Sequence, residues 1–237
     1  MAQQQSSKKH PTVSSPIATF KYPKLNEPDY GTKEYPNPDG SYNVRLVMGA
    51  DSPEAKELLA TLQPHYENAR AEADAAFAAL PVGTRKKLGS VKMNPLFSEI
   101  YDRETEQPTG EIEFKISMKA SGVRKKGPKA GTRWHRKPAI YDAHGAYLAK
   151  PPAIWGGTKG RVNFEVAPYF INGTGAAGLR LGLNGVQIVD LVSVGARSAE
   201  SMGFGAVEGG YAHVNEPAPE AQTDADNTEL NDGSGDF

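Results

Sequence analysis

Short stretches in which apolar and polar residues alternate are the feature that most limits the fold of this chain. In residues 41–49, Tyr42, Val44, Leu46 and Met48 share one face and polar residues share the other. A period of two residues is typical of a strand with one buried face. Further strands are predicted at residues 17–25, 111–119, 161–171 and 185–194, the last being apolar enough to be covered on both sides. Many short strands with Gly- and Pro-rich turns favour a mainly β (α+β) domain, a small antiparallel barrel, over a βαβ sheet.

Two segments interrupt this pattern. Residues 30–40 are rich in Pro, Gly and Asp and predict a loop. Residues 52–80 predict a helix, because apolar residues recur there with a 3.6-residue period and Asp51 and Glu54 have the spacing of a capping box. Pro64 predicts a kink or a split within that helix.

Charge is segregated along the chain, although the net charge is only −1. Residues 215–237 hold seven acids and no Lys or Arg, which leaves residues 1–214 with 27 basic and 21 acidic side chains and a net charge of +6. A basic body with an acidic tail indicates a surface for a polyanion. The composition predicts a disordered lead (residues 1–15), one globular domain (16–200) and a disordered acidic tail (201–237).

The strongest local feature is a run of cations between residues 115 and 137 that contains no acid. Its centre is rich in glycine and therefore predicts a loop, and two aromatic residues, Trp134 and Tyr141, lie within or just after it. Cations neutralise phosphates, and aromatic faces stack on unpaired bases. The run therefore favours single-stranded nucleic acid, and the alternative is a solvated hairpin tip with Trp134 in the core. The predicted contact residues are Lys115, Lys119, Arg124, Lys125, Lys126, Lys129, Arg133, Trp134, Arg136, Lys137 and Tyr141.

A second cluster, residues 155–161, combines glycines with Trp155, Lys159 and Arg161. Glycines allow a backbone to approach a phosphate closely, so these three side chains are further candidates for nucleic-acid contact. The spacing is not that of a P-loop. A glycine turn that leads into a strand remains the alternative.

Catalysis has little support in the sequence. The five histidines are scattered without metal-ligand spacing, and neither a GxSxG motif nor a thiol is present. We therefore expect no catalytic residue, no metal and no cofactor. The alternative within the enzyme class is a metal-dependent nuclease or recombination accessory that uses Asp102, Glu111 and Glu113.

Several further absences narrow the class of protein. Cysteine is absent, so disulfides are excluded, which fits a reducing compartment. The first sixteen residues are polar, which predicts no signal peptide, and no apolar run approaches the roughly 18 residues that a membrane span needs. We expect a cytoplasmic protein without a membrane partner.

The acidic tail ends in an unusual way for a segment that only aids solubility. Asp232, Asp236 and the terminal Phe237 combine negative charge with an exposed aromatic ring on a glycine-rich tether. Such an end could dock in an apolar pocket with a basic rim on a partner protein. It could also lie on the protein's own basic surface and compete with a nucleic acid.

Three segments carry a family resemblance: residues 137–143 (KPAIYDA), 154–158 (IWGGT) and 177–191 (AGLRLGLNGVQIVDL). In this order, and with the acidic tail, the chain resembles the bacteriophage single-stranded DNA-binding proteins of the OB-fold class over roughly residues 12–200. The resemblance implies an OB barrel with a helical insertion at about residues 52–80.

The resemblance also implies a function. It implies largely sequence-independent binding of single-stranded DNA in phage DNA replication, recombination and repair, in the cytoplasm of the infected bacterium. It implies a tail that contacts replication and recombination proteins, and the inserted helix could serve as a homo-oligomer contact. A virion or scaffold protein with an incidental basic loop is the third alternative.

Overall fold

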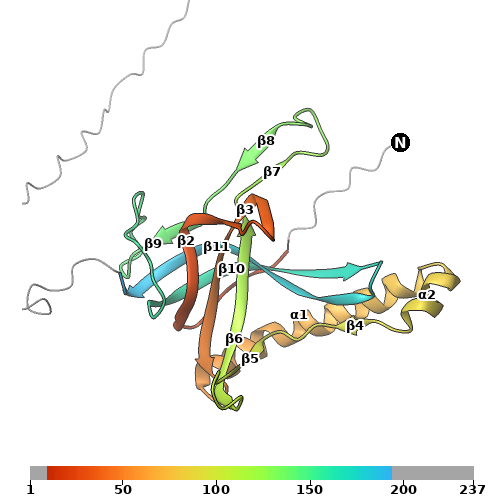
Figure 1. The fold of residues 1–237 in the computed structure, drawn as a ribbon, viewed down its shortest axis with the longest axis horizontal. Helices are drawn as coiled ribbons and strands as arrows, with labels where there is room; N and C mark the ends of the chain where they lie inside the picture. Colours follow the sequence, from red (N-terminus) through yellow and green to blue (C-terminus); the bar gives the residue numbers. More distant parts are fainter. Residues whose placement is uncertain (1–9, 194–237) are drawn as a thin grey trace, which may run out of the picture. The chain divides into compact units, whose positions relative to one another are not determined.

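The computed structural model describes residues 10–193. The predicted acidic tail, with Asp232, Asp236 and Phe237, lies outside the described residues. Strands predominate, and the helices lie beside them (Figure 1). The described elements are β1 (Thr12–Ser14), β2 (Ala18–Gly31), β3 (Pro36–Gly49), α1 (Pro53–Ala78), α2 (Val82–Leu88), β4 (Lys92–Met93), β5 (Ser98–Tyr101), β6 (Pro108–Lys119), β7 (Ser121–Val123), β8 (Arg133–His135), β9 (Ala139–Tyr141), β10 (Lys159–Ile171) and β11 (Ala176–Asp190).

Five of the strands close into a ring. β2 pairs with β3, β3 with β6, β6 with β11, β11 with β10, and β10 again with β2. Four of these pairings are antiparallel, and the β6–β11 pairing is parallel, with Gly182 opposite Ser117. A closed five-stranded barrel in which the last two strands exchange places is the OB arrangement. The predicted fold class is therefore confirmed.

The barrel interior follows from the alternation in the sequence. The inward residues of β3 and β6 are opposite one another, for example Val44 opposite Ile116 and Leu46 opposite Phe114, and all four are fully buried. Tyr42 is buried with them, as its place on the apolar face predicts. Phe20 of β2, which the sequence did not place, also belongs to this core.

Ring closure depends on a glycine at the start of β10. Gly160 lies opposite Ala18 of β2 on one side and Ile188 of β11 on the other. A Cβ atom at this position would lie 2.3 Å from the carbonyl oxygen of Gln187 and 2.7 Å from the Phe20 ring. Because backbone and core occupy that space, only a residue without a side chain allows the three strands to meet there.

The helix α1 closes the barrel with its first half. Its N-cap is Ser52, whose hydroxyl accepts a hydrogen bond from Ala55 N–H at 3.1 Å, so the predicted cap at Asp51 is off by one residue. Ala55, Leu58 and Leu62 join the barrel core. The second half of α1 lies beneath the extended β10–β11 hairpin (Figure 1).

The predicted split of α1 at Pro64 is wrong. Pro64 lies inside one helix that runs to Ala78. Proline leaves the carbonyl of Ala60 without its helical donor, but both residues are exposed, so water can bond that oxygen. A second helix, α2, follows where the sequence predicted only an end.

Three other boundaries differ from the sequence prediction. The predicted loop at residues 30–40 reduces to residues 32–35, because β2 continues through its prolines by shifts of register against β3. Within the predicted disordered lead, residues 12–14 form β1 against β10. The last predicted strand, residues 185–194, is part of β11 and ends at Asp190, and it is not covered on both sides at this end, since Val189 and Val192 are exposed.

Candidate nucleic-acid interface

The outward side chains of the barrel gather cations on one face. Lys21 of β2, Arg45 of β3 and Lys115 of β6 are consecutive partners across three strands. Arg180 of β11 extends this row, since it precedes Gly182 by two residues as Lys115 precedes Ser117 in the parallel pair. With Lys119 and Arg136 these residues form what we call the basic face: Lys21, Arg45, Lys115, Lys119, Arg136 and Arg180.

A buried carboxylate organises one side of this face. Glu113 points outward from β6, yet only 8% of it is exposed. One carboxylate oxygen accepts a hydrogen bond from Lys21 Nζ at 3.0 Å, and the other accepts one from Arg45. The pairing satisfies the buried charge and holds the two cations in place.

A groove follows the boundary between β6 and β11, where a single residue pair joins the strands. It consists of two adjoining hollows of about 330 and 460 Å³ that share Ser117 and Arg180 as walls. The first hollow also has Lys115 and Tyr169 in its wall. The side chains around the second, from four strands and the segment after β8, are Ser117, Met118, Lys119, Trp134, Arg136, Glu165, Arg180, Leu183 and Asn184, with Gly182 between them. We call the two hollows together the seam groove.

The second hollow concentrates charge beside an aromatic ring. The guanidinium of Arg136 lies 5.1 Å from the Trp134 ring centroid, a cation–π distance. Burial lowers the pKa of Arg136, the neighbouring charge of Arg180 lowers this pKa further, and Glu165 opposes both effects. Two arginines within range of each other concentrate positive charge here and form a site that favours an anion.

Trp134 reaches the groove because the short hairpin β7–β8 holds it there. It lies opposite Gly122, where a Cβ atom would come within 2.7 Å of the indole. The ring is half-buried and does not belong to the barrel core. The ring therefore packs on the hairpin backbone and under Arg136. It is neither a fully exposed stacking surface nor a residue of the core, the two alternatives that the sequence left open.

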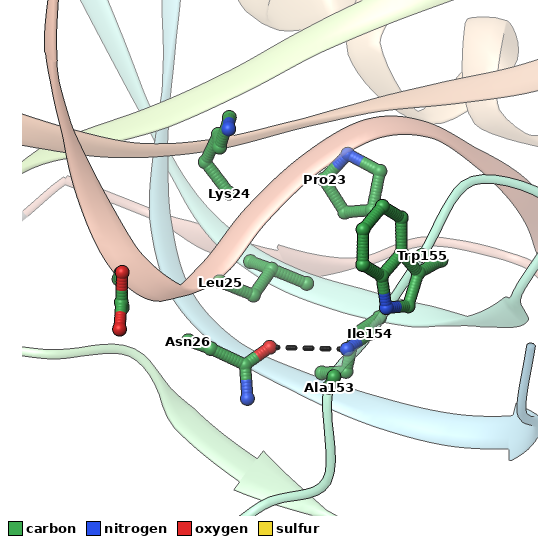
Figure 2. Close-up of a pocket in the computed structure, with 8 residues that line it drawn as sticks. Pro23, Lys24, Leu25, Asn26, Ala153, Ile154 and Trp155 are labelled. Atoms are coloured by element: carbon green, nitrogen blue, oxygen red, sulfur yellow. Dashed lines mark hydrogen bonds between the residues drawn. The ribbon is translucent and has the colours of Figure 1, made fainter. Parts of the chain in front are cut away.

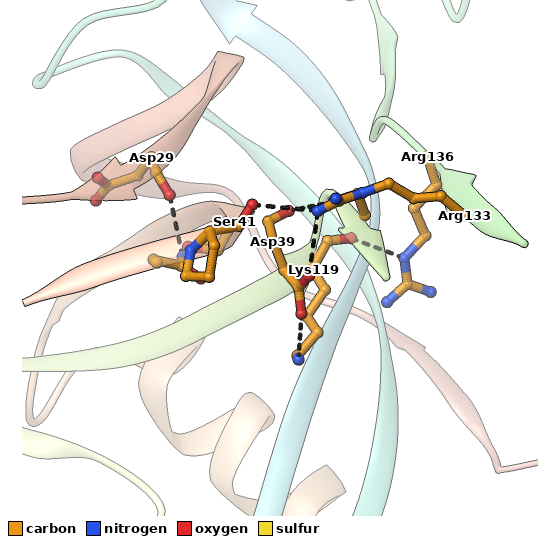
Figure 3. Close-up of polar contacts among 9 residues, drawn as sticks. Asp29, Asp39, Ser41, Lys119, Arg133 and Arg136 are labelled. Carbon is orange, nitrogen blue, oxygen red and sulfur yellow. Dashed lines mark hydrogen bonds and ion pairs between the residues drawn. The ribbon is translucent and has the colours of Figure 1, made fainter. Parts of the chain in front are cut away.

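Arg133 serves the hairpin rather than the groove. Its guanidinium donates to Pro38 O, to Asp39 and to Ser121 Oγ, and Lys119 donates to the same Asp39 at 3.0 Å. Figure 3 shows Asp39 between the two cations, with Arg136 donating to the backbone oxygen of Lys119. These bonds fasten the hairpin to the start of β3.

The remaining predicted cations of this segment stay in solvent. The tip between β7 and β8 carries four exposed cations, and none of their side chains has a polar partner within residues 10–193: Arg124, Lys125, Lys126 and Lys129. Lys137 is likewise exposed. Tyr141 and Arg161 flank Gln187 on the outside of β9, β11 and β10, so they continue the surface of β11 beyond the groove.

Trp155 and Lys159 lie apart from the seam groove. Trp155 is about half exposed and flanks a separate hollow of about 390 Å³ beside residues 23–27 of β2 (Figure 2). Asn26 fixes that loop by accepting a hydrogen bond from Ile154 N–H at 3.1 Å. Lys159 lies opposite Thr19 and lines a hollow with Glu54 of α1.

The acids of the nuclease alternative do not converge. Asp102 caps a turn, and hydrogen bonds from Thr105 lower the pKa of its carboxyl group. Glu113 is held by two cations, as described above, and Glu111 is exposed. Residues 10–193 contain no group of three side chains placed to hold a metal ion.

Sequence reasoning missed four residues of this region: Lys21, Arg45, Glu165 and Arg180. Arg180 had a signal, because Leu179, Leu181 and Leu183 alternate with Arg180, Gly182 and Asn184 in the sequence. Assigning these residues to one face required the strand register, which local alternation does not contain.

Comparisons with known proteins agree on one group. A family model described as the single-stranded DNA-binding protein of bacteriophage T7 matches residues 18–191, from the first residue of β2 to just past β11. The single-stranded DNA-binding protein of Escherichia phage T7 is 26% identical over 226 residues, 91% of this chain and 94% of that protein. That of Enterobacteria phage T3 is 26% identical over 192 residues, 80% of each. The crystal structure of gp2.5, a single-stranded DNA-binding protein encoded by bacteriophage T7, covers 86% of this chain and 100% of that chain, with a TM-score of 0.60 and 24% identity.

Proposed function

Since the chain belongs to the family of the bacteriophage T7 single-stranded DNA-binding protein, a non-enzymatic family, we propose that it binds single-stranded DNA largely without regard to sequence. It would protect such DNA during phage replication, recombination and repair in the cytoplasm of the infected bacterium. Neither helix within residues 10–193 is long and apolar enough to cross a membrane.

The observation that carries this proposal is the seam groove within the basic face. Lys115, Lys119, Arg136 and Arg180 would neutralise phosphates along it. Trp134, which lies beside Arg136, would present a ring on which a base can stack. Bases are available for stacking only when the strand is unpaired. The hairpin tip, Lys137, Tyr141 and Arg161 would extend the contact, and Trp155 with Lys159 would form a separate one.

Binding to oligo(dT) should be tighter than binding to a matched duplex and should weaken with salt. If Lys115, Lys119, Arg136 and Arg180 each meet one phosphate, the slope of log affinity against log salt is about −2.8. Fluorescence anisotropy with full-length protein at several salt concentrations measures both quantities. Equal affinity for duplex, or affinity independent of salt, would contradict the proposal.

For the acidic tail we propose two roles, supported by its negative charge and its aromatic residue Phe237. It would contact replication and recombination proteins through Asp232, Asp236 and Phe237, and it would compete with DNA for the basic face. A homo-oligomer contact on α1 stays a prediction of the sequence.

Removing residues 215–237 should tighten oligo(dT) binding at low salt, because the seven carboxylates compete with phosphates. The gain should shrink as salt rises, since screening weakens both attractions. Anisotropy titrations of the two proteins, with matched duplex as a second ligand, test this. If removing the tail leaves the affinity unchanged, the tail does not compete with DNA. If neither protein binds DNA, the scaffold alternative is favoured.

A further inference from the structure

One side chain of the seam groove is out of place in a site for a polyanion. Glu165 points outward from β10 into the second hollow, among Lys119, Arg136 and Arg180. A carboxylate there repels phosphate. Unlike the side chains of Glu113 and Asp39, the Glu165 side chain forms no hydrogen bond or ion pair with any residue of the described range 10–193.

The surroundings of Glu165 leave its carboxylate accessible. It lies opposite Thr12 of β1 and Gly182 of β11, and Gly182 lies opposite Ser117 of β6. All three neighbours are small, and a Cβ atom at Gly182 would be 3.9 Å from Glu165 Oε2. The carboxylate therefore lies at the floor of the groove without being covered.

We infer that Glu165 reads an unpaired guanine that enters the seam groove. This inference rests on the proposed single-strand binding and refines it. Guanine is the one DNA base whose Watson–Crick edge offers two adjacent donors, N1–H and the N2 amino group, and a carboxylate accepts two parallel hydrogen bonds. Adenine and cytosine place a ring acceptor beside their amino group, and thymine flanks its N3–H with two carbonyl oxygens.

The other groove residues complement the rest of the same base. Guanine O6 and N7 accept from an arginine, the commonest base-specific contact of that side chain, and Arg136 and Arg180 both lie in the hollow with Glu165. The ring plane can stack on Trp134 or on the Arg136 guanidinium. A volume of about 460 Å³ lies within the range of roughly 300–1,000 Å³ that small ligands occupy.

The test compares oligo(dT) with the same oligonucleotide carrying guanine at every third position, so that one guanine reaches the groove in each register. Full-length protein should bind the guanine-containing strand about fivefold more tightly, the low end expected for a bidentate base contact in a solvated groove. Inosine, which lacks the N2 amino group, should retain only part of this advantage.

Glu165→Gln should abolish the guanine advantage while affinity for oligo(dT) stays equal or rises, because an amide cannot accept both hydrogen bonds. Glu111→Gln, which removes the same charge from an exposed position of β6, should keep the advantage. If Glu165→Gln tightens both strands equally and leaves their ratio unchanged, Glu165 only balances the arginines and the inference is wrong. Loss of all oligonucleotide binding in the unaltered protein would instead refute the proposed function.

Discussion

Replacing Arg136 and Arg180 together by glutamine is expected to weaken oligo(dT) binding by about two orders of magnitude at low salt. A charge-assisted hydrogen bond contributes roughly 1.5 kcal/mol, which is about tenfold in affinity for each arginine. Both residues lie in the second hollow of the seam groove, where the charge of Arg180 acts on Arg136, so an anion between them relieves their mutual repulsion. The salt slope should become shallower by about 1.4, because two phosphate contacts are lost.

The matched control removes two exposed cations from α1, Lys56 and Arg70, which line none of the groove. Replacing Lys56 and Arg70 together should change the affinity for oligo(dT) by less than about twofold, because salt screens charges that lie away from the groove. Arg180→Gln alone isolates the groove effect, because Arg136 also bonds the backbone of Lys119 and so supports the hairpin. Equal losses in the α1 control would mean that overall charge, rather than the groove, carries the affinity.

The sequence predicted the barrel strands because their alternation is a local property. Phe114 and Ile116 point inward and Lys115 outward whatever the partner strand is, so β6 could be predicted from its own residues. The strand predicted at residues 17–25 is the first half of β2, but the continuation of β2 to Gly31 could not be predicted in this way. Pro28 argues against a strand there when taken alone, and the register shifts against β3 accommodate it.

The candidate site was predictable in part for the same reason. The basic run around residues 115–137 is visible in the sequence, and the structure brings Lys115, Lys119, Trp134 and Arg136 of that run to one groove. Arg180 and Glu165 reach it from β11 and β10 through strand pairing, which depends on barrel closure rather than on neighbouring residues. Arg133 has the right chemistry for a phosphate, but its contacts to Pro38 and Asp39 give it a structural role.

Phe114→Ala is expected to lower the free energy of unfolding by about 3–5 kcal/mol, the usual range for a buried phenylalanine. Phe114 is fully buried in the middle of β6, opposite Leu46, and its ring centroid lies 6.0 Å from that of Phe97. Removing the ring leaves a cavity at a point where β3, β5 and the barrel interior meet. Urea denaturation followed by fluorescence or circular dichroism measures the loss.

Lys115, the next residue of β6, should show the opposite effects on stability and on DNA binding. Lys115 points outward from the same strand, so Lys115→Ala should change stability by less than about 0.5 kcal/mol and weaken oligo(dT) binding. Phe114→Ala should bind oligo(dT) nearly normally at temperatures where it remains folded, because its side chain touches no DNA. Substitutions at these two adjacent residues of β6 should thus affect different properties: Phe114→Ala lowers stability, and Lys115→Ala lowers affinity for DNA. A loss below about 1 kcal/mol for Phe114→Ala would mean that β6 does not turn this ring into the barrel, and the outward row of cations would then lose its basis.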